Sequence, residues 1–252
     1  LQNVVDEAQA ALLITDNPDR AKALGFSPVS RNTNGALQLM QRPLPPHWEA
    51  LPEGVDKITF TSGTTGNPKG VCLSLEQQLH VASALQEATA GLMIKTHLCL
   101  LPFSVLLENI AGVYAPMLSG ANIVCPEPSE TGLHGASHFD AVQCLNTIAK
   151  YKAESIILLP QMLFALLQAT HPGDPRTASL KLIAVGGGKV PGSLLSLAHA
   201  MSLPVYEGYG LSECASVVCL NTPANQRTNT VGKALPGVEV RVDEQGEVWV
   251  KG

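Results

Sequence analysis

The chain has 252 residues, a formal net charge of −5 and no basic run, which argues against a nucleic-acid surface or a polybasic membrane contact. Its best apolar run, near residues 156–160, is strand-length, whereas a membrane-spanning helix needs about 20 apolar residues. No charged signal segment opens the chain and its six cysteines form no C-x-x-C pair, so we expect reduced thiols and a soluble, cytoplasmic protein, or a piece of one.

The first predicted elements are a helix over residues 4–10, strands over 11–15 and 56–61, and a helix over 75–90. Residues 17–52 are rich in Pro, Asn and Ser and show little periodicity, so we expect connecting structure there. The helix over 75–90 has apolar residues at helical spacing that predict one face: Leu75, Leu79, Ala82 and Leu85.

From residue 97 onward, apolar strands alternate with helices. The predicted strands cover residues 97–101, 121–125, 155–159 and 180–185, and another begins at 205. The predicted helices cover residues 108–118, 139–151, 161–169 and 191–200. Such alternation favours parallel strands joined by right-handed crossovers, and continuous apolar strands indicate a sheet covered on both faces. We predict an α/β fold with mostly parallel sheets flanked by helices.

The C-terminal stretch changes character. Residues 238–242 and 247–250 alternate as strands around a turn at 243–246, which predicts an antiparallel hairpin. We therefore divide the chain into an α/β region, residues 1–221, and the beginning of a small β subdomain, residues 222–252. Because the chain stops directly after an apolar strand, we expect the natural protein to continue beyond Gly252.

The strongest chemical signal is the segment 61–70, Thr-Ser-Gly-Thr-Thr-Gly-Asn-Pro-Lys-Gly. Its glycines let backbone N–H groups approach an anion, its hydroxyls donate hydrogen bonds and Lys69 adds positive charge, so the segment suits a polyphosphate. The alternative is a polar surface loop, because loops of this composition are common. The P-loop pattern G-x-x-x-x-G-K-[ST] does not fit, since Pro68 stands five residues after Gly63 and Gly70 follows Lys69.

Residues 186–188 form a second glycine segment, directly after the strand predicted over 180–185. Three glycines permit either close packing of a strand on a helix or contact with a nucleotide. A dinucleotide fingerprint needs glycine where Pro191 stands, although Glu207, about 20 residues further on, keeps that reading open as an alternative.

A third segment, residues 209–213, combines an aromatic ring with a carboxylate. Tyr209 lies between two glycines, which suits stacking on a purine as well as ordinary packing. Glu213 offers the hard oxygen ligands that Mg²⁺ prefers, although a single glutamate is usually a surface charge. The seven histidines, His80 and His97 among them, match no metal or triad spacing and are interpreted as packing or surface residues.

In combination, these motifs resemble those of the adenylate-forming superfamily, which includes acyl-CoA synthetases, luciferases and peptide synthetase adenylation domains. Residues 61–70 are similar to the signature loop of that family. Further segments resemble, in the family's order, the acyl-pocket segment, the adenine-lining glycines, the Tyr-Gly-x-Thr-Glu motif and the start of the next subdomain: residues 102–109, 186–188, 209–213, and 231–248. The resemblance runs from about Asp56 to the end of the chain.

The resemblance implies three groups of site residues. Those that hold the ATP phosphates are Ser62, Gly63, Thr64, Thr65, Gly66 and Lys69. Those that bind adenine and the α-phosphate side are Gly187, Gly188, Tyr209, Gly210 and Ser212. Glu213 is implied as the Mg²⁺ ligand, and the catalytic residues are Thr64, Lys69 and Glu213.

Two departures from the family pattern affect these assignments. Ser212 stands where the family more often has Thr, and it keeps the hydroxyl. Val105 stands where the acyl-pocket segment often carries His or an aromatic residue, so it receives no role here. The family's ribose-binding Asp, and its C-terminal domain with a catalytic Lys, are expected beyond Gly252, and residues 1–252 alone are expected to turn over poorly.

The implied reaction is attack of a carboxylate on the α-phosphorus of ATP with release of pyrophosphate, then transfer of the acyl group to a thiol. We expect an AMP-forming acid–thiol ligase that uses ATP and Mg²⁺, acts on a fatty acid and has coenzyme A as acceptor. Two alternatives remain open. One is an adenylation module that loads a carrier-protein thiol, and the other is a nucleotide-binding fragment without turnover.

Overall fold

The computed structural model describes residues 2–29, 37–44, 50–61, 69–134 and 138–252. The chain divides into two compact units, Leu1–Cys72 and Leu73–Gly252, which are described separately. Within the described residues, no helix combines the length and the apolar character needed to cross a membrane. The boundary predicted at residue 221, which rests on function and strand pattern, stays a prediction.

The first unit contains a small antiparallel sheet in the order β1-β3-β2 and a two-stranded pair, β4-β5. Its elements are α1 (Gln2–Glu7), β1 (Leu12–Thr15), α2 (Pro18–Ala23), β2 (Ser27–Pro28), β3 (Gln38–Gln41) and β4 (Lys57–Thr61), with β5 (Lys69–Leu73) at its end. Four buried side chains form its core: Val5, Ala21, Phe26 and Met40.

The prediction of connecting structure over residues 17–52 was wrong, because this stretch contains α2, β2 and β3. The side chain of Asn17 caps α2 by accepting a hydrogen bond from the backbone N–H of Arg20, and Pro18 occupies the first turn. β3 pairs with β1 in the register Ile14↔Leu39. The stabilising partner of β3 therefore lies in a distant segment, which local periodicity does not reveal.

The second unit is built on a seven-stranded sheet in the order β14-β13-β12-β11-β10-β6-β7. The strands are β6 (Thr96–Leu98), β7 (Asn122–Val124), β10 (Ser155–Leu158), β11 (Leu182–Val185), β12 (Val205–Tyr209), β13 (Cys219–Leu220) and β14 (Lys233–Ala234). The first five pair in parallel, and β13 and β14 are antiparallel. The predicted α/β fold with a mostly parallel sheet is confirmed.

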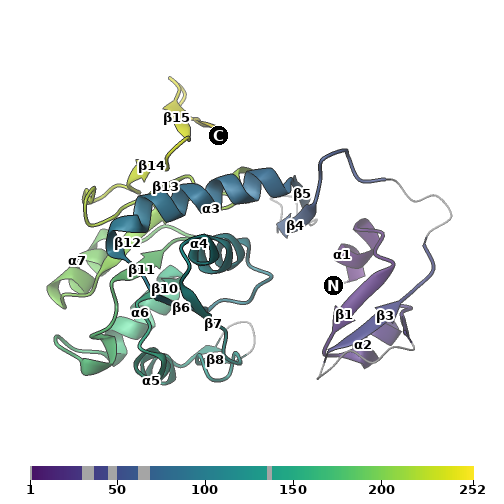
Figure 1. The fold of residues 1–252 in the computed structure, drawn as a ribbon, viewed down its shortest axis with the longest axis horizontal. Helices are drawn as coiled ribbons and strands as arrows, with labels where there is room; N and C mark the ends of the chain where they lie inside the picture. The colour runs from purple at the N-terminus through teal and green to yellow at the C-terminus, as the bar shows by residue number, and fades with distance from the viewer. Residues whose placement is uncertain (1, 30–36, 45–49, 62–68, 135–137) are drawn as a thin grey trace. The chain divides into compact units, whose positions relative to one another are not determined.

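Helices pack in two groups around this sheet (Figure 1). One group is α3 (Leu75–Thr89), the π-helical segment η2 (Glu108–Tyr114) and α4 (Ala115–Leu118). The other is α5 (Ala141–Tyr151), α6 (Pro160–Ala169) and α7 (Gly192–Ala200). Short 3-10 turns, η1 (Ala90–Leu92), η3 (Pro175–Thr177) and η4 (Ser212–Cys214), and a small hairpin, β8 (Leu133–His134) with β9 (His138–Phe139), complete the connections.

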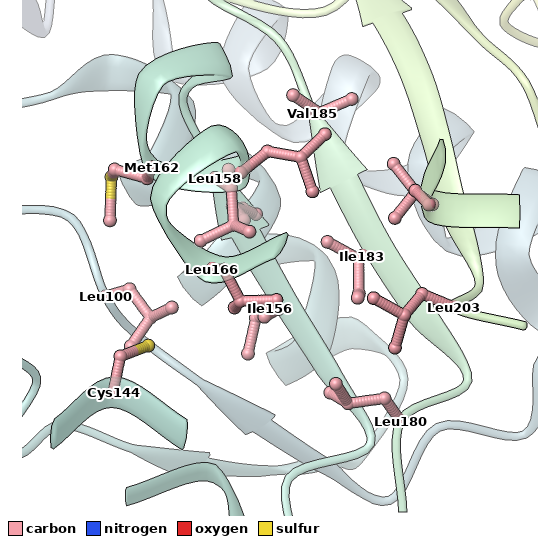
Figure 2. Close-up of a cluster of buried hydrophobic side chains, with 14 of the residues drawn as sticks. Leu100, Cys144, Ile156, Leu158, Met162, Leu166, Leu180, Ile183, Val185 and Leu203 are labelled. Carbon is pink, nitrogen blue, oxygen red and sulfur yellow. The ribbon is translucent and has the colours of Figure 1, made fainter. Parts of the chain in front are cut away.

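The main core lies between the sheet and the second group of helices. Figure 2 shows Met162 and Leu166 of α6 over Ile156 and Leu158 of β10, with Ile183 of the neighbouring strand beside them. These strands are apolar on this face because a helix covers it, and burying each such side chain contributes roughly 1.5–3 kcal/mol of hydrophobic stabilisation.

The buried face of α3 agrees with the prediction at Ala82 and Leu85, which are buried, but not at Leu75 and Leu79. Leu75 and Leu79 are 48% and 41% exposed, whereas Gln78 is buried. The side-chain amide of Gln78 donates a hydrogen bond to the carbonyl oxygen of Ser74, which itself caps the helix in a capping box with Gln77. A face assigned from apolar residues alone therefore missed a buried polar side chain.

The predicted C-terminal hairpin is confirmed as β15 (Glu239–Val242) and β16 (Val248–Lys251), paired antiparallel with Val240 opposite Val250. Asp243 closes the turn, because its carboxylate accepts hydrogen bonds from the backbone N–H of Glu247 and the indole N–H of Trp249.

Candidate active site

Two of the glycine segments singled out in the sequence leave the sheet side by side. β11 and β12 are parallel neighbours with Val185 opposite Glu207, so residues 186–188 and 208–210 follow the carboxyl ends of adjacent strands. The two backbones lie close, since a Cβ added to Gly186 would stand 3.5 Å from the carbonyl oxygen of Gly208. Open α/β sheets bind ligands at this kind of edge.

The backbone at this edge needs glycine at two of the predicted positions. Gly187 has φ +75°, a conformation that L side chains rarely adopt, and an added Cβ would lie 2.9 Å from Leu159 Cδ2. At Gly210 an added Cβ would overlap the carbonyl oxygen of Ser216 and stand 2.8 Å from the Cα of Val217. Both glycines therefore allow a close approach of two chain segments.

The segment after Tyr209 is tightly turned. Ala215 and Ser216 both have positive φ values, 51° and 96°, and the backbone N–H of Ser216 donates to the carbonyl oxygen of Leu211 at 3.1 Å. Conformations of this kind cost on the order of 1–3 kcal/mol each and gather at functional sites. Glu213 sits in the turn with an exposed side chain, and no residue of the described chain forms an ion pair with it.

A cavity of about 370 Å³ opens beside these segments, within the second unit. Predicted site residues that line it are Gly187, Tyr209, Gly210 and Ser212. Its remaining lining is mostly apolar and includes Leu85 of α3, Ala111 of η2 and Ile157 of β10. Cavities of this size and character hold small molecules. Val105, from the predicted acyl-pocket segment, also lines it.

Glu108, from the acyl-pocket segment, takes part in a buried polar network that the sequence interpretation missed. His97 and Ser155 are opposite each other on β6 and β10, and His97 Nδ1 lies 2.8 Å from Ser155 Oγ. His97 Nε2 lies 3.2 Å from Glu108 Oε1, and the backbone N–H of Leu101 donates to Glu108 Oε2 at 3.1 Å. His97, Glu108 and Ser155 are 2%, 0% and 3% exposed, and His97 and Ser155 line the cavity.

The available signal for this network was weak. His97 interrupts an otherwise apolar strand, but its partners stand 11 and 58 residues away. No recognised motif has that spacing, so only the register of β6 on β10 identifies the pair.

Cys99 adds a thiol to the same cluster. Its Sγ lies 3.6 Å from the carbonyl oxygen of Gly112, and burial together with the nearby Glu108 carboxylate raises the pKa of Cys99, so the thiol is neutral. One ligand atom each from His97, Cys99 and Glu108 lie within 4.8 Å of one another. A metal ion bound there would displace the hydrogen bonds that already satisfy the imidazole and the carboxylate.

The remaining predicted site residues are placed as follows. Lys69 begins β5 with an exposed side chain in the first unit. Gly188 and Glu213 lie just outside the cavity lining, and an added Cβ on Gly188 would meet Pro160. The phosphate-loop residues Ser62, Gly63, Thr64, Thr65 and Gly66 lie outside the described residues, so their roles, and that of Lys69, stay predictions.

Glu207 bears on the dinucleotide alternative. Burial raises the pKa of its carboxyl group, and the backbone N–H of Val190 hydrogen-bonds to it, which acts in the opposite direction. The carboxyl group of Glu207 therefore binds the backbone of the loop that follows residues 186–188. The same carboxyl group is the feature on which the dinucleotide alternative rests.

Comparisons with known proteins identify a family and a shared fold. The family model described as AMP-binding enzyme matches residues 1–252. A 3-[(3aS,4S,7aS)-7a-methyl-1,5-dioxo-octahydro-1H-inden-4-yl]propanoyl:CoA ligase of Rhodococcus jostii is 29% identical, over 80% of this chain and 38% of its own length. A 2-succinylbenzoate–CoA ligase of Bacillus licheniformis is 28% identical, over 98% of this chain and 52% of its own. The chain thus spans about half or less of the length of these relatives.

Solved structures share the fold. O-succinylbenzoate coenzyme A synthetase of Bacillus subtilis, in complex with ATP and magnesium ion, has a TM-score of 0.63 at 24% identity, covering 77% of this chain and 40% of that one. ATP-bound MatB of Rhodopseudomonas palustris has a TM-score of 0.67 at 23% identity, covering 79% and 39%.

Proposed function

The chain belongs to the AMP-binding enzyme family, and from this we propose that its parent protein activates a carboxylic acid with ATP and transfers the acyl group to coenzyme A. The observation that carries the proposal is the convergence of residues 186–187 and 209–212 on one largely apolar cavity. Relatives named as CoA ligases support coenzyme A, rather than a carrier protein, as the acceptor.

In the proposed reaction, a carboxylate oxygen of the acid attacks the α-phosphorus of ATP and the bond to the β-phosphate oxygen breaks, which releases pyrophosphate and leaves acyl-AMP. The sulfur of coenzyme A then attacks the acyl carbon and AMP leaves. No protein nucleophile is needed, so the chain supplies binding, orientation and exclusion of water. The cavity provides the last of these, since its lining is mostly apolar.

We assign the nucleotide to the strand-end segments. The Tyr209 ring is 36% exposed at the end of β12 and offers a surface for adenine, with the glycines at 186–187 leaving space beside it. The Ser212 hydroxyl would reach the α-phosphate. Glu213 fits a Mg²⁺ ion, because its carboxylate is exposed and has no cationic partner among the described residues. A bound Mg²⁺ supplies charge neutralisation at the phosphates.

The acid-binding role falls to the rest of the cavity. Leu85, Leu107, Ala111 and Ile157 give it apolar walls suited to an acid with an apolar body. The fatty acid expected from the sequence is one such acid. The two relatives are named for acids that contain rings, 2-succinylbenzoate and a dioxo-octahydroindenyl propanoate, so the panel of test acids needs both kinds.

The test is acid-dependent exchange of labelled pyrophosphate into ATP by the full-length parent, followed by assay of acyl-CoA. Tyr209→Ala should raise the KM for ATP by about tenfold or more, since stacking on an aromatic ring contributes about 1–3 kcal/mol per base. Tyr209→Phe keeps the ring and is the matched control, with KM near that of the wild type. An unchanged KM in Tyr209→Ala would overturn the placement of adenine.

Two further outcomes separate the alternatives. Exchange without acyl-CoA, together with acylation of a carrier-protein thiol, would identify a carrier-loading module. Nucleotide binding with no exchange for any acid of the panel would identify a binding module without turnover and refute the proposed reaction.

A further inference from the structure

Two cysteines lie opposite each other on neighbouring strands of the main sheet. β6 and β7 pair in parallel with Leu98 opposite Val124, and the backbone N–H of Cys99 donates to the carbonyl oxygen of Val124 at 2.9 Å. Cys99 and Cys125 are the next residues along the two strands, and Cys125 Sγ lies 3.9 Å from Cys99 Sγ. The sheet therefore holds two thiols in contact.

A disulfide between these cysteines fits the spacing of the sheet. Cα atoms joined by a disulfide are usually about 4.4–6.8 Å apart, and neighbouring strands lie about 4.7–4.9 Å apart. Both side chains stand on the same side of the sheet, since their sulfur atoms are in contact. The bond needs a closer approach of the two sulfurs and no change in the register of β6 on β7.

The two thiols differ in their access to solvent. Cys125 is exposed, whereas Cys99 is 5% exposed. Burial and the nearby Glu108 carboxylate raise the pKa of Cys99, so this thiol is neutral and a poor nucleophile toward an oxidant in solution. Cys125 is therefore the thiol that a small oxidant reaches first, and Cys99 lies behind it.

We propose that Cys125 is a site of oxidation by hydrogen peroxide, and that Cys99 then forms a disulfide with it that loosens the η2 wall of the cavity. In the first step the Cys125 thiolate attacks one peroxide oxygen. The S–O bond forms, the O–O bond breaks and hydroxide leaves, which gives a sulfenic acid. In the second step the sulfur of Cys99 attacks the sulfur of Cys125. The S–S bond forms, the S–O bond breaks, and the leaving hydroxide takes the Cys99 proton as water. Two thiols and one peroxide thus give one disulfide and two waters.

The disulfide acts on the cavity through η2. Two groups placed to accept a hydrogen bond from the Cys99 thiol lie on this segment: the carbonyl oxygen of Gly112 at 3.6 Å and the side chain of Glu108. A disulfide has no S–H, so η2 loses this donor, and the Cys99 sulfur moves toward Cys125 on the neighbouring strand. Ala111, next to Gly112, lines the cavity. Oxidation should therefore weaken binding of the acid, a step that rests on the proposed function.

The nucleotide segments provide an internal comparison. Residues 186–187 and 209–212 lie at the ends of β11 and β12, and β10 lies between these strands and the β6–β7 pair. We expect oxidation to raise the KM for the acid by about threefold, the order of one weak hydrogen bond, and to leave the KM for ATP unchanged.

The experiment treats the full-length parent with hydrogen peroxide, alkylates the remaining thiols and maps the digested protein by mass spectrometry. We expect a pair of peptides joined through Cys99 and Cys125, lighter by two hydrogen atoms than the two reduced peptides together. Dithiothreitol should separate the pair and restore the KM for the acid. Absence of the joined peptides would overturn the inference, and a KM that stays raised after reduction would overturn the link between the disulfide and the cavity.

Two variants test the order of the steps. In Cys99→Ser the oxidised Cys125 has no thiol partner, so its sulfenic acid should persist and react with dimedone. In Cys125→Ser the buried Cys99 should stay reduced, and the kinetics should not respond to peroxide. Cys72→Ser is the matched control, because it removes another exposed thiol and should keep both the disulfide and the response. Dimedone on Cys99 in Cys125→Ser would overturn the assigned order. If a variant does not fold, the peptide map of the wild type decides.

Kinetics separate the disulfide from its effect on the cavity. Cys99→Ala removes the same S–H donor, so it should raise the KM for the acid without peroxide by a similar factor. A disulfide that forms and leaves this KM unchanged would overturn the link to η2. The peptide map does not depend on turnover. Failure of every acid in pyrophosphate exchange therefore refutes the proposed function alone, and absence of the joined peptides refutes the disulfide alone.

Discussion

Gly112→Ala is a small change that should break the buried network. Gly112 lies in η2, on the same segment as Glu108, and both are buried. A Cβ added to Gly112 would clash with Glu108 Oε1 and stand 2.8 Å from His97 Nε2. The carboxylate cannot yield without loss, because the His97 ring and the backbone N–H of Leu101 hold it in place.

The expected loss of stability follows from the two contacts that the displaced Glu108 carboxylate loses, those with His97 and with the backbone N–H of Leu101. Breaking a buried ion pair so that one partner is left uncompensated destabilises the fold by about 3–5 kcal/mol. Replacing a helical glycine by alanine stabilises it by about 0.4–1 kcal/mol, because the unfolded chain has less conformational entropy to lose. The net loss in the free energy of unfolding is roughly 3 kcal/mol. For a protein of this size, that lowers Tm by roughly 6–12 °C.

The assay is thermal and urea unfolding of the full-length protein, with Gly91→Ala as the matched control. Gly91 lies in η1 with an ordinary φ and nothing within 4 Å of an added Cβ, so its substitution should leave stability equal or slightly higher. In a Glu108→Ala background the contact with the carboxylate is gone and only the contact with His97 Nε2 remains, so Gly112→Ala should then cost less. Equal destabilisation in the two backgrounds would refute the reasoning, because it would place the effect outside the Glu108 contact.

Three further predictions concern other parts of the second unit. Gly210→Ala should raise the KM for ATP by about tenfold and lower Tm, because the new Cβ overlaps the Ser216 carbonyl oxygen and forces the turn to move; kinetics and unfolding measured together check this, and a wild-type KM would contradict it. Glu213→Gln should leave Tm unchanged while Mg²⁺-dependent pyrophosphate release falls steeply, since the amide lacks the ligand charge; a wild-type rate with a lowered Tm would favour a structural role. Asp174→Asn should destabilise by roughly 2–4 kcal/mol at neutral pH, because the Arg176 guanidinium holds the pKa of the buried Asp174 well below its ordinary 3.8. A depressed folded-state pKa gives stability above about pH 4 that is lost as the pH falls through that pKa, so the difference between wild type and variant in urea unfolding should shrink in acid, and a pH-independent difference would contradict the assignment.

Sequence pattern predicted those parts of the fold whose cause is local. The alternation of apolar strands and helices from residue 97 onward predicted the parallel sheet, because strands covered on both faces read as continuous apolar runs. Residues 17–52 were misjudged because β3 is stabilised by pairing with β1, a distant strand that the local sequence around β3 does not reveal. The predicted face of α3 was right at Ala82 and Leu85 but missed Gln78, a buried polar side chain that apolar periodicity does not reveal.

The candidate site likewise has one part that the sequence predicted and one part that it did not. The glycines and Tyr209 at the strand ends were predictable. Open α/β sheets bind ligands at the carboxyl ends of their strands, and glycines there let a ligand approach the backbone closely. The His97–Ser155–Glu108 network was not predictable, because its members stand 11 and 58 residues apart, although Glu108 belongs to the segment that resembles the acyl-pocket segment. His97 becomes a cavity residue when β6 pairs with β10, and Glu108 becomes its partner when η2 packs back on that sheet.

This division suggests how one scaffold separates reaction from selection. The segments to which we assign the nucleotide are loops whose positions depend on backbone contacts, such as the approach of Gly210 to Ser216, so side-chain changes elsewhere should leave them in place. Ser155, which lines the cavity, is instead a side chain inside a strand whose backbone pairs with β6 and β11 on either side. Replacing such a side chain should change the lining of the cavity while the strand that carries it stays in register. Replacing Ser155 should therefore leave in place the strand ends to which we assign the nucleotide.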